Sequence, residues 1–355
     1  MRTCNLAVAV SAALGLLSVN VLAESSTTLG GKTYIDFTHI DQKSDGTSIA
    51  PTGTGADVKR FYVGIDHKFN DVWSADLTTD FTYISNDSAT QVYVKKAYLQ
   101  GKFSDAAVLR AGSADLPWVP FVEHLYGYRY VENTLIDRLK FGTSADWGLH
   151  AGGKLGDGMF SYAVSAINGN GYKNPSRSKG VDFTGRIGVE PIEGLTLAAG
   201  YYNGKLGQDT QGGPATRSAS RWDVVAAYVK PSFGAGAEYF SAEDWKSSNN
   251  NAVLSANPSD KADGYSLWGS VKPMEKVALF ARYDHAKPNK DTNPALKDRY
   301  YNVGVSYQVY KNVDLSLVYK DEKVDGGSIS TSNGTIGGTN DGSYKEIGVW
   351  TQVKF

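Results

Sequence analysis

The chain contains a single cysteine, Cys4, and this residue lies within the first 23 positions. The rest of the sequence can therefore form neither a disulfide nor a cysteine-based metal site. Histidine is also scarce, and none of the five histidines has a neighbour at the short spacing typical of a zinc site. We therefore expect no metal, no other cofactor and no catalytic residues.

Long hydrophobic runs and a surplus of charge are missing as well. Hydrophobic residues make up 41% of the chain. Beyond residue 23, however, no apolar run approaches the roughly 20 residues that a membrane-spanning helix needs. Basic and acidic side chains number 36 and 37, a net charge of −1, so nucleic acid is not an expected partner. Any passage of this chain through a membrane would have to use strands.

The N-terminus has the pattern of an export signal. A single basic residue precedes an apolar stretch from Leu6 to Leu17, and a small-x-small sequence ends at Ala23. The apolar stretch is too short for a transmembrane anchor. We predict a signal peptide over residues 1–23 and a single exported domain over residues 24–355.

Beyond Leu29, runs of about ten residues alternate between apolar and polar side chains, as strands with two different faces do. Short turns alternate with long polar connections between these runs, a rhythm typical of transmembrane barrels. The sequence predicts an all-β fold, a transmembrane antiparallel β-barrel of about 16 strands. The expected strands cover residues 29–40, 58–68, 72–83, 91–102, 107–115, 144–155, 159–167, 180–190, 194–203, 221–230, 233–241, 263–272, 276–286, 299–309, 312–322 and 344–355. Long outer connections are expected at 41–57, 204–220, 242–261 and 323–343.

The segment from Leu116 to Phe141 breaks this alternation. It contains two prolines, and five aromatic residues lie between Trp118 and Tyr130. Loops longer than about 12–15 residues are usually functional. If the alternating runs close into a barrel, we expect this loop to fold into the lumen and to act as the gate of a pore.

The ends of the strands point to a membrane barrel and to a family. Aromatic residues that favour membrane interfaces gather there, namely Tyr83, Tyr201, Trp222, Tyr239, Tyr265, Tyr283, Tyr307 and Tyr319. The last strand alternates from Ile347 to Val353 and ends on Phe355. With the signal peptide, sixteen strands and a long third outer loop, this ending resembles the Gram-negative outer-membrane porins of the general and phosphate-selective types.

This resemblance implies a channel in the outer membrane through which small hydrophilic solutes and ions diffuse passively, without enzymatic activity. It further implies a third loop folded into the lumen and three barrels associated as a homotrimer. The expected surroundings are outer-membrane lipid and lipopolysaccharide.

Charged residues on the polar face of the strands and on the long loop are the candidate functional groups. We expect a pore constriction formed by Lys96, Arg110, Asp115, Glu123, Arg129 and Glu132, and a lumen wall that carries Lys32, Arg60, Arg186 and Arg282. Strict alternation lets only one of Lys95 and Lys96 face inward, and we predict Lys96. Because Arg129, Arg138 and His124 mix with the acids of the loop, we expect weak ion selectivity.

Three other functions stay open at this point. A solute-specific channel for phosphate would need a dense ladder of basic residues, and one for sugar a continuous aromatic track, whereas this chain has a mixture of both. A secreted carbohydrate-binding β-protein could also alternate in this way. An outer-membrane barrel enzyme would need a serine beside His39 or His67 on the lipid face, and the sequence shows no such partner.

Overall fold

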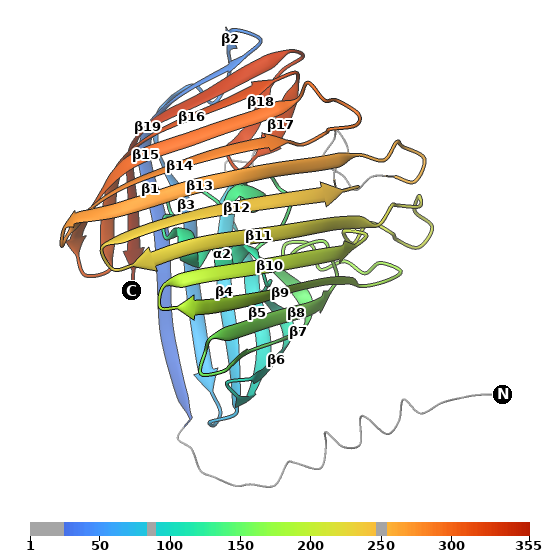
Figure 1. Cartoon of the computed structure of the whole chain (residues 1–355), viewed down its shortest axis with the longest axis vertical. Helices are drawn as coiled ribbons and strands as arrows, with labels where there is room; N and C mark the ends of the chain where they lie inside the picture. The colour runs from blue at the N-terminus through green and yellow to red at the C-terminus, as the bar shows by residue number, and fades with distance from the viewer. Residues whose placement is uncertain (1–24, 84–89, 246–253) are drawn as a thin grey trace.

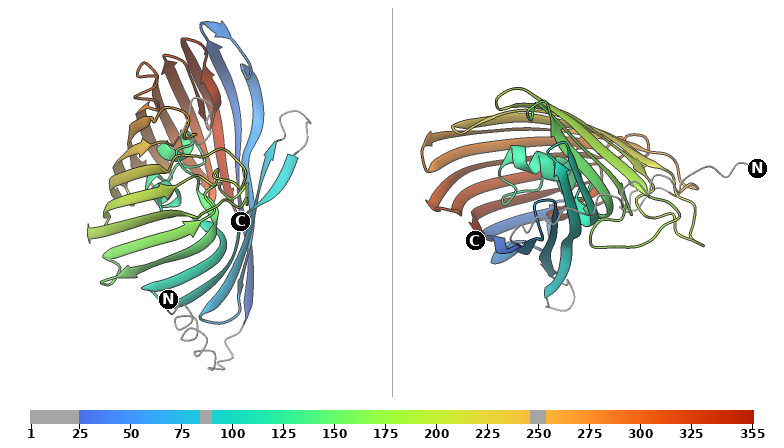
Figure 2. Two further views of the ribbon diagram at one scale, coloured as in Figure 1. Left: turned by 90° about the vertical axis from the view of Figure 1, so that its right-hand side faces the viewer. Right: turned by 90° about the horizontal axis from the view of Figure 1, so that it is seen from below.

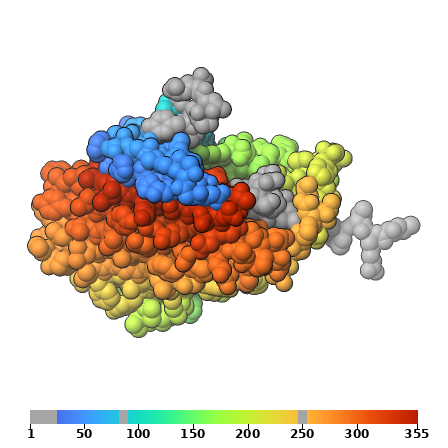
Figure 3. All heavy atoms as spheres, turned by 90° about the horizontal axis from the view of Figure 1, so that it is seen from above, coloured from blue at the N-terminus to red at the C-terminus, as the bar shows by residue number. Residues whose placement is uncertain are grey.

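The computed structural model describes residues 25–83, 90–245 and 254–355. In these residues one sheet of seventeen strands forms, and one of them, β2 (Thr47–Ser48), is a two-residue extension. The other sixteen pair antiparallel in chain order, and β1 (Ser26–Ser44) pairs with both β3 (Gly53–Lys68) and the last strand, β19 (Asp341–Lys354). The sheet therefore closes into a barrel. Figure 3 shows the closing seam, where the blue N-terminal strands lie against the red C-terminal ones.

All sixteen predicted strands are confirmed (Figure 1). The strands between β3 and β19 are β4 (Trp73–Tyr83), β5 (Thr90–Ser104), β6 (Ala107–Asp115), β7 (Ala145–Leu155), β8 (Phe160–Ile167), β9 (Asp182–Ile192), β10 (Leu195–Gly204), β11 (Ala219–Lys230), β12 (Phe233–Glu243), β13 (Lys261–Met274), β14 (Val277–Lys287), β15 (Lys297–Tyr310) and β16 (Val313–Asp325). The predicted signal peptide lies outside the described residues. In the described part of the chain, no helix is long and apolar enough to cross a membrane.

Two of the predicted outer loops are partly strand, which corrects the expected boundaries. Residues 41–57 hold the end of β1, all of β2 and the start of β3. Residues 323–343 hold the end of β16 and a separate hairpin of β17 (Ser328–Thr331) and β18 (Gly334–Gly337). β2 and the added ends of β1 and β3 are mostly polar, and each hairpin strand has only four residues with one buried isoleucine. They therefore lack the longer apolar alternation by which a strand is recognised. The predicted loop at 242–261 lies partly outside the described residues.

The two faces of the barrel differ in the way that a membrane requires. On β14, Leu279 is 43% exposed and Ala278 only 7%, and the same alternation runs through the neighbouring strands. Exposed aromatic residues border the apolar band of the outer face: Tyr201, Trp222, Tyr239, Tyr265, Tyr283 and Tyr301 near one end of the strands, and Tyr307 and Tyr310 near the other. Strand pairing places the first set in a row, since Tyr239 lies opposite Tyr265 and Tyr283 opposite Tyr301. An apolar outer face between two aromatic rows is the arrangement of a barrel surrounded by lipid.

This register makes Leu279 a test of the lipid face. Replacing Leu279 by arginine is expected to cost about 2–4 kcal/mol of folding free energy in lipid, because a cation would enter the apolar band. The matched change Ala278→Ser, on the inner face of the same strand, is expected to be nearly neutral. Unfolding of both variants in lipid vesicles measures the difference, and equal stability would mean that Leu279 does not face the apolar band.

Candidate functional site

The segment between β6 and β7 forms a small helical unit. Helix α2 (Val119–Tyr126) has a proline in its first turn and ends at Gly127, whose φ of 79° is left-handed, and both features favour a helix of this extent. Val119, Val122 and Tyr126 lie on one side of α2 and are buried. They form a common core with the buried residues that follow, Leu135, Ile136, Leu139 and Phe141, the first two in the short helix α3 (Leu135–Arg138).

This unit contacts the polar face of the strands. The Trp118 indole donates to the Glu238 carboxylate of β12 at 2.8 Å. The Tyr130 hydroxyl lies 3.1 Å from the Ser306 hydroxyl of β15 and 2.6 Å from the Ser316 hydroxyl of β16. All of these side chains are buried. In both views of Figure 2 the teal segment with α2 lies among the strands.

Arg138 is the strongest attachment of the segment. Its fully buried guanidinium donates to Asp284 at 3.0 Å and to Asp298 at 2.5 Å, and it also pairs with Glu322. Burial disfavours the cation, but the three carboxylates raise the pKa of Arg138 well above its usual value. Arg282, a predicted wall residue, shares Asp284 at 2.7 Å and donates to the loop carbonyl of residue 133. Both arginines therefore bind the loop to the wall.

Glu132 is a second attachment. Its carboxylate accepts from the Ser332 hydroxyl at 2.7 Å and from the Asn333 amide at 3.0 Å, and it lies 3.5 Å from the ammonium of Lys320 on β16. Burial opposes its ionisation, yet Lys320 and the hydrogen bond from Ser332 lower the pKa of Glu132 to about 2. The structure thus places Glu132 against the turn of the β17–β18 hairpin, where it lines a cavity together with Arg129.

Four residues of the predicted constriction come together on the other side of the loop, as two separate pairs. The ammonium of Lys96 lies 2.6 Å from Asp115 at the end of β6. The guanidinium of Arg129 lies 2.5 Å from Glu123 and 3.5 Å from Asp137, all three within the loop. Glu123 and Asp137 therefore share one arginine within the loop, whereas Asp115 pairs with a lysine of the wall.

The remaining predicted residues have individual partners. Arg60 pairs with Asp80 at 2.9 Å. Arg186 donates to the carbonyl of residue 117 at 3.0 Å and lies over the Phe121 ring at 3.8 Å, so it supports the loop. The Arg110 guanidinium donates to Gln100 at 2.8 Å, within the wall. Lys32 is exposed and lies over tyrosine rings.

Two β-bulges change which lysines face inward. Between β4 and β5 the register passes from Thr78–Lys96 to Thr79–Val94, which leaves Lys95 as the extra residue. A bulge reverses the alternation, so Lys95 and Lys96 both face inward, and the prediction that only one does so is wrong. Lys95 donates to the Tyr62 hydroxyl at 3.3 Å.

The second bulge lies between β1 and β3. There the register passes from Tyr34–Arg60 to Ile35–Val58, and Lys59 is the extra residue. The Lys59 ammonium lies 3.3 Å from the buried Asp36 on the inner face of β1. Neither Lys59 nor Lys95 was predicted from the sequence to face inward, and the only signal for them was the adjacency of two basic residues in one strand.

Two cavities run along this side of the loop. One, of about 650 Å³, is lined near the chain ends by residues such as Gly30 and Lys354, and the other, of about 510 Å³, is lined by residues of the opposite strand ends such as Asp57 and Ser332. Tyr34 and Arg129 line both cavities. Among the described lining residues, basic side chains outnumber acidic ones by five to three in the first cavity and by six to three in the second.

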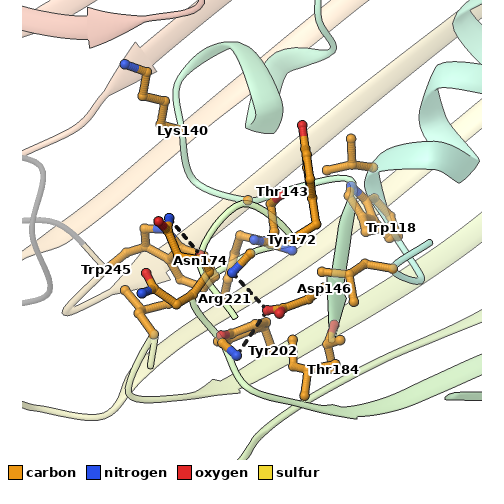
Figure 4. Close-up of a pocket in the computed structure, with 18 of the residues that line it drawn as sticks. Trp118, Lys140, Thr143, Asp146, Tyr172, Asn174, Thr184, Tyr202, Arg221 and Trp245 are labelled. Carbon is orange, nitrogen blue, oxygen red and sulfur yellow. Dashed lines mark hydrogen bonds between the residues drawn. The ribbon is translucent and has the colours of Figure 1, made fainter. Parts of the chain in front are cut away.

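A third cavity, of about 380 Å³, lies between the loop and β7–β11 (Figure 4). Tyr202 and Trp245 pack at 4.6 Å in its lining, and the Arg221 guanidinium lies 4.7 Å from the Trp245 ring. Arg221 also donates to the carbonyl of residue 141 at the end of the loop and pairs with Asp223 at 2.8 Å. These aromatic residues support the loop rather than form a continuous track.

Catalysis or metal binding would require grouped histidine, cysteine or carboxylate side chains. In the described part of the chain, no group of three His, Cys, Asp or Glu side chains could hold a metal ion. Three histidines contact hydroxyls, and the most buried of them is His150, whose Nδ1 lies 2.9 Å from Ser165 Oγ. Its other ring nitrogen faces the carbonyl of residue 112 at 3.3 Å, where a Ser-His-Asp triad would have a carboxylate.

Known structures share this fold. An anion-selective porin from Comamonas acidovorans aligns with a TM-score of 0.70 and 13% identity, over 94% of this chain and 100% of the other. The outer-membrane channel DcaP of Acinetobacter baumannii aligns with a TM-score of 0.64 and 14% identity, over 95% and 99%. The outer-membrane protein OmpT of Vibrio cholerae, in its trimer form, aligns with a TM-score of 0.60 and 14% identity, over 93% and 99%. No curated protein matches the chain significantly in sequence.

The family follows from the sequence match together with this fold. The model of the Gram-negative porin family matches residues 7–339, which is most of the chain. The closed barrel, its apolar outer face and its charged inner face agree with that match. The chain belongs to the Gram-negative porins and is an outer-membrane channel for passive diffusion.

Proposed function

We propose that small hydrophilic solutes and ions cross this barrel beside the long loop, between Arg129 and the wall of β1, β3 and β5. The observation that carries the proposal is the pair of cavities that share Tyr34 and Arg129. On the other side the loop core packs against β11–β16 and leaves a smaller cavity, of about 360 Å³. The constriction then lies at Tyr34 and Arg129, with a wider vestibule on each side.

Within this proposal the channel has no enzymatic role. The contacts of His150 include no carboxylate among the described residues, and the charged groups of the loop bind one another or the wall. Charge pairs of this kind position the loop and keep the lumen polar, which is sufficient for passive diffusion. A phosphate- or sugar-specific site has no separate support.

The test is conductance of the purified protein in planar bilayers. We expect stepwise insertion of open channels with a linear current–voltage relation at low voltage, together with swelling of proteoliposomes in small sugars. If no channel currents appeared in the bilayers and the proteoliposomes did not swell, the proposal would be contradicted. A variant with Arg129 replaced by tryptophan should conduct less, because a bulky ring would stand where the two cavities meet.

We further propose that three barrels associate, as OmpT of Vibrio cholerae does in its trimer form. Residues 1–23 are proposed to be removed on export, so the mature chain would begin at Glu24. Light scattering of the detergent-solubilised protein and N-terminal sequencing test these two points. A monomeric mass, or an uncleaved N-terminus in the outer-membrane fraction, would contradict the respective proposal.

A further inference from the structure

Two lysines of the channel wall share one tyrosine. The Lys32 ammonium lies 5.2 Å from the centre of the Tyr62 ring, and the Lys95 ammonium lies 4.6 Å from it. Lys32 also lies 5.8 Å from the Tyr34 ring, which lines both cavities. The bulge in β5 is what brings Lys95 to this place.

Lysines also lie over tyrosine rings in the direction of the second cavity, the one lined by Asp57 and Ser332. Lys95 lies 5.8 Å from the ring of Tyr172, which is stacked on Tyr93 with their centres 5.9 Å apart. The Lys173 ammonium lies 4.5 Å from the Tyr93 ring. Lys32 and Lys95 line the cavity nearer the chain ends, and Lys173 lines the opposite one, so the three cations extend past the constriction.

The three lysines differ from the other cations of the wall in having no acidic partner. In the described ranges, neither Lys32, Lys95 nor Lys173 forms an ion pair, whereas Lys96 and Arg129 are each held by a carboxylate. A ring face attracts an ammonium group but carries no net charge, so it does not cancel the charge of the lysine beside it. Two acids of the loop, Glu123 and Asp137, share the single positive charge of Arg129.

We infer that Lys32, Lys95 and Lys173 form a track for small anions and make the channel more permeable to anions than to cations. The inference rests on the proposed function, because it names the class of solute that the same route favours. A surplus of fixed positive charge along a narrow aqueous path raises the local concentration of anions and lowers that of cations. The ion pairs of the constriction, Lys96 with Asp115 and Arg129 with Glu123 and Asp137, add no surplus of positive charge to this preference.

The test is the reversal potential of single channels in a gradient of potassium chloride at low salt, where the Debye length is about 10 Å or more. The reversal potential of the unmodified protein should lie closer to the equilibrium potential of chloride than to that of potassium. Lys95→Glu should lower the chloride-to-potassium permeability ratio by about tenfold or more, because reversing a unit charge about 5 Å from the passing ions disfavours the anion and favours the cation at once. Lys95→Gln should lie between the two.

Lys102→Glu is the matched control. Lys102 is on the same strand, half exposed at its end, and is paired with Asp105 at 2.8 Å outside both cavities. This variant should keep the permeability ratio of the unmodified protein. Conducting channels without anion preference, or equal effects of the two charge reversals, would overturn the inference and leave the proposed route intact. A protein that does not conduct at all would instead overturn the proposed function.

Discussion

Replacing Arg138 by methionine is expected to lower the free energy of unfolding by about 3–5 kcal/mol. The same change is expected to increase the fluctuations of the single-channel current. Asp284 would keep Arg282, but Asp298 and Glu322 would stay buried without a cation. The cost comes from removing one side of a buried ion cluster, and because Arg138 holds the loop, the same change should let the loop move. Unfolding in urea and single-channel recordings measure the two effects.

Arg299→Met provides the control for this prediction. Arg299 also pairs with an aspartate, Asp325, at 2.5 Å, but both side chains are about half exposed. A surface ion pair of this kind contributes about 0–1 kcal/mol, so this variant should resemble the unmodified protein. Combining Arg138→Met with Asp298→Asn and Glu322→Gln should recover part of the loss, because the uncompensated charges are then gone. Equal stability of the Arg138 and Arg299 variants would show that the buried cluster does not hold the loop.

Removing Val119 to Thr134 and joining the ends with a short glycine linker should increase the single-channel conductance several-fold. The deletion removes α2 and Arg129 and would merge the two cavities, while Arg138 and its three carboxylates remain. Because the deletion widens the aqueous path and removes the constriction at Tyr34, larger solutes should also pass. Conductance and swelling in sugars of increasing size measure both effects.

A deletion of residues 210–214 serves as the comparison. These residues belong to another outer connection and line neither of the two cavities, so the conductance should stay unchanged. If the long-loop deletion also left the conductance unchanged, the loop would not border the route of the solutes. The proposed constriction would then have to be abandoned.

The strands could be predicted from the sequence because alternation is a local property. Each run in contact with lipid must place apolar residues at every second position, so the alternation of Phe61 and Ile65 with Arg60 and Asp66 separates the two faces of a strand. The same reasoning predicted the closing strand from Ile347 to Val353. It failed at the outer ends of β1, β3 and β16, where strands leave the membrane and no longer need an apolar face.

Local patterns in the chain were thus enough to specify the barrel, the number of strands and the position of the long loop. Which charges meet depends instead on tertiary packing. A bulge depends on how a strand pairs with its neighbour, so no pattern within β5 could show that Lys95 joins Lys96 inside. The position of Arg138 among three carboxylates depends on how the loop packs against strands more than 140 residues away. Pairing between distant segments, which no local period records, therefore sets the charge that a solute meets in this channel.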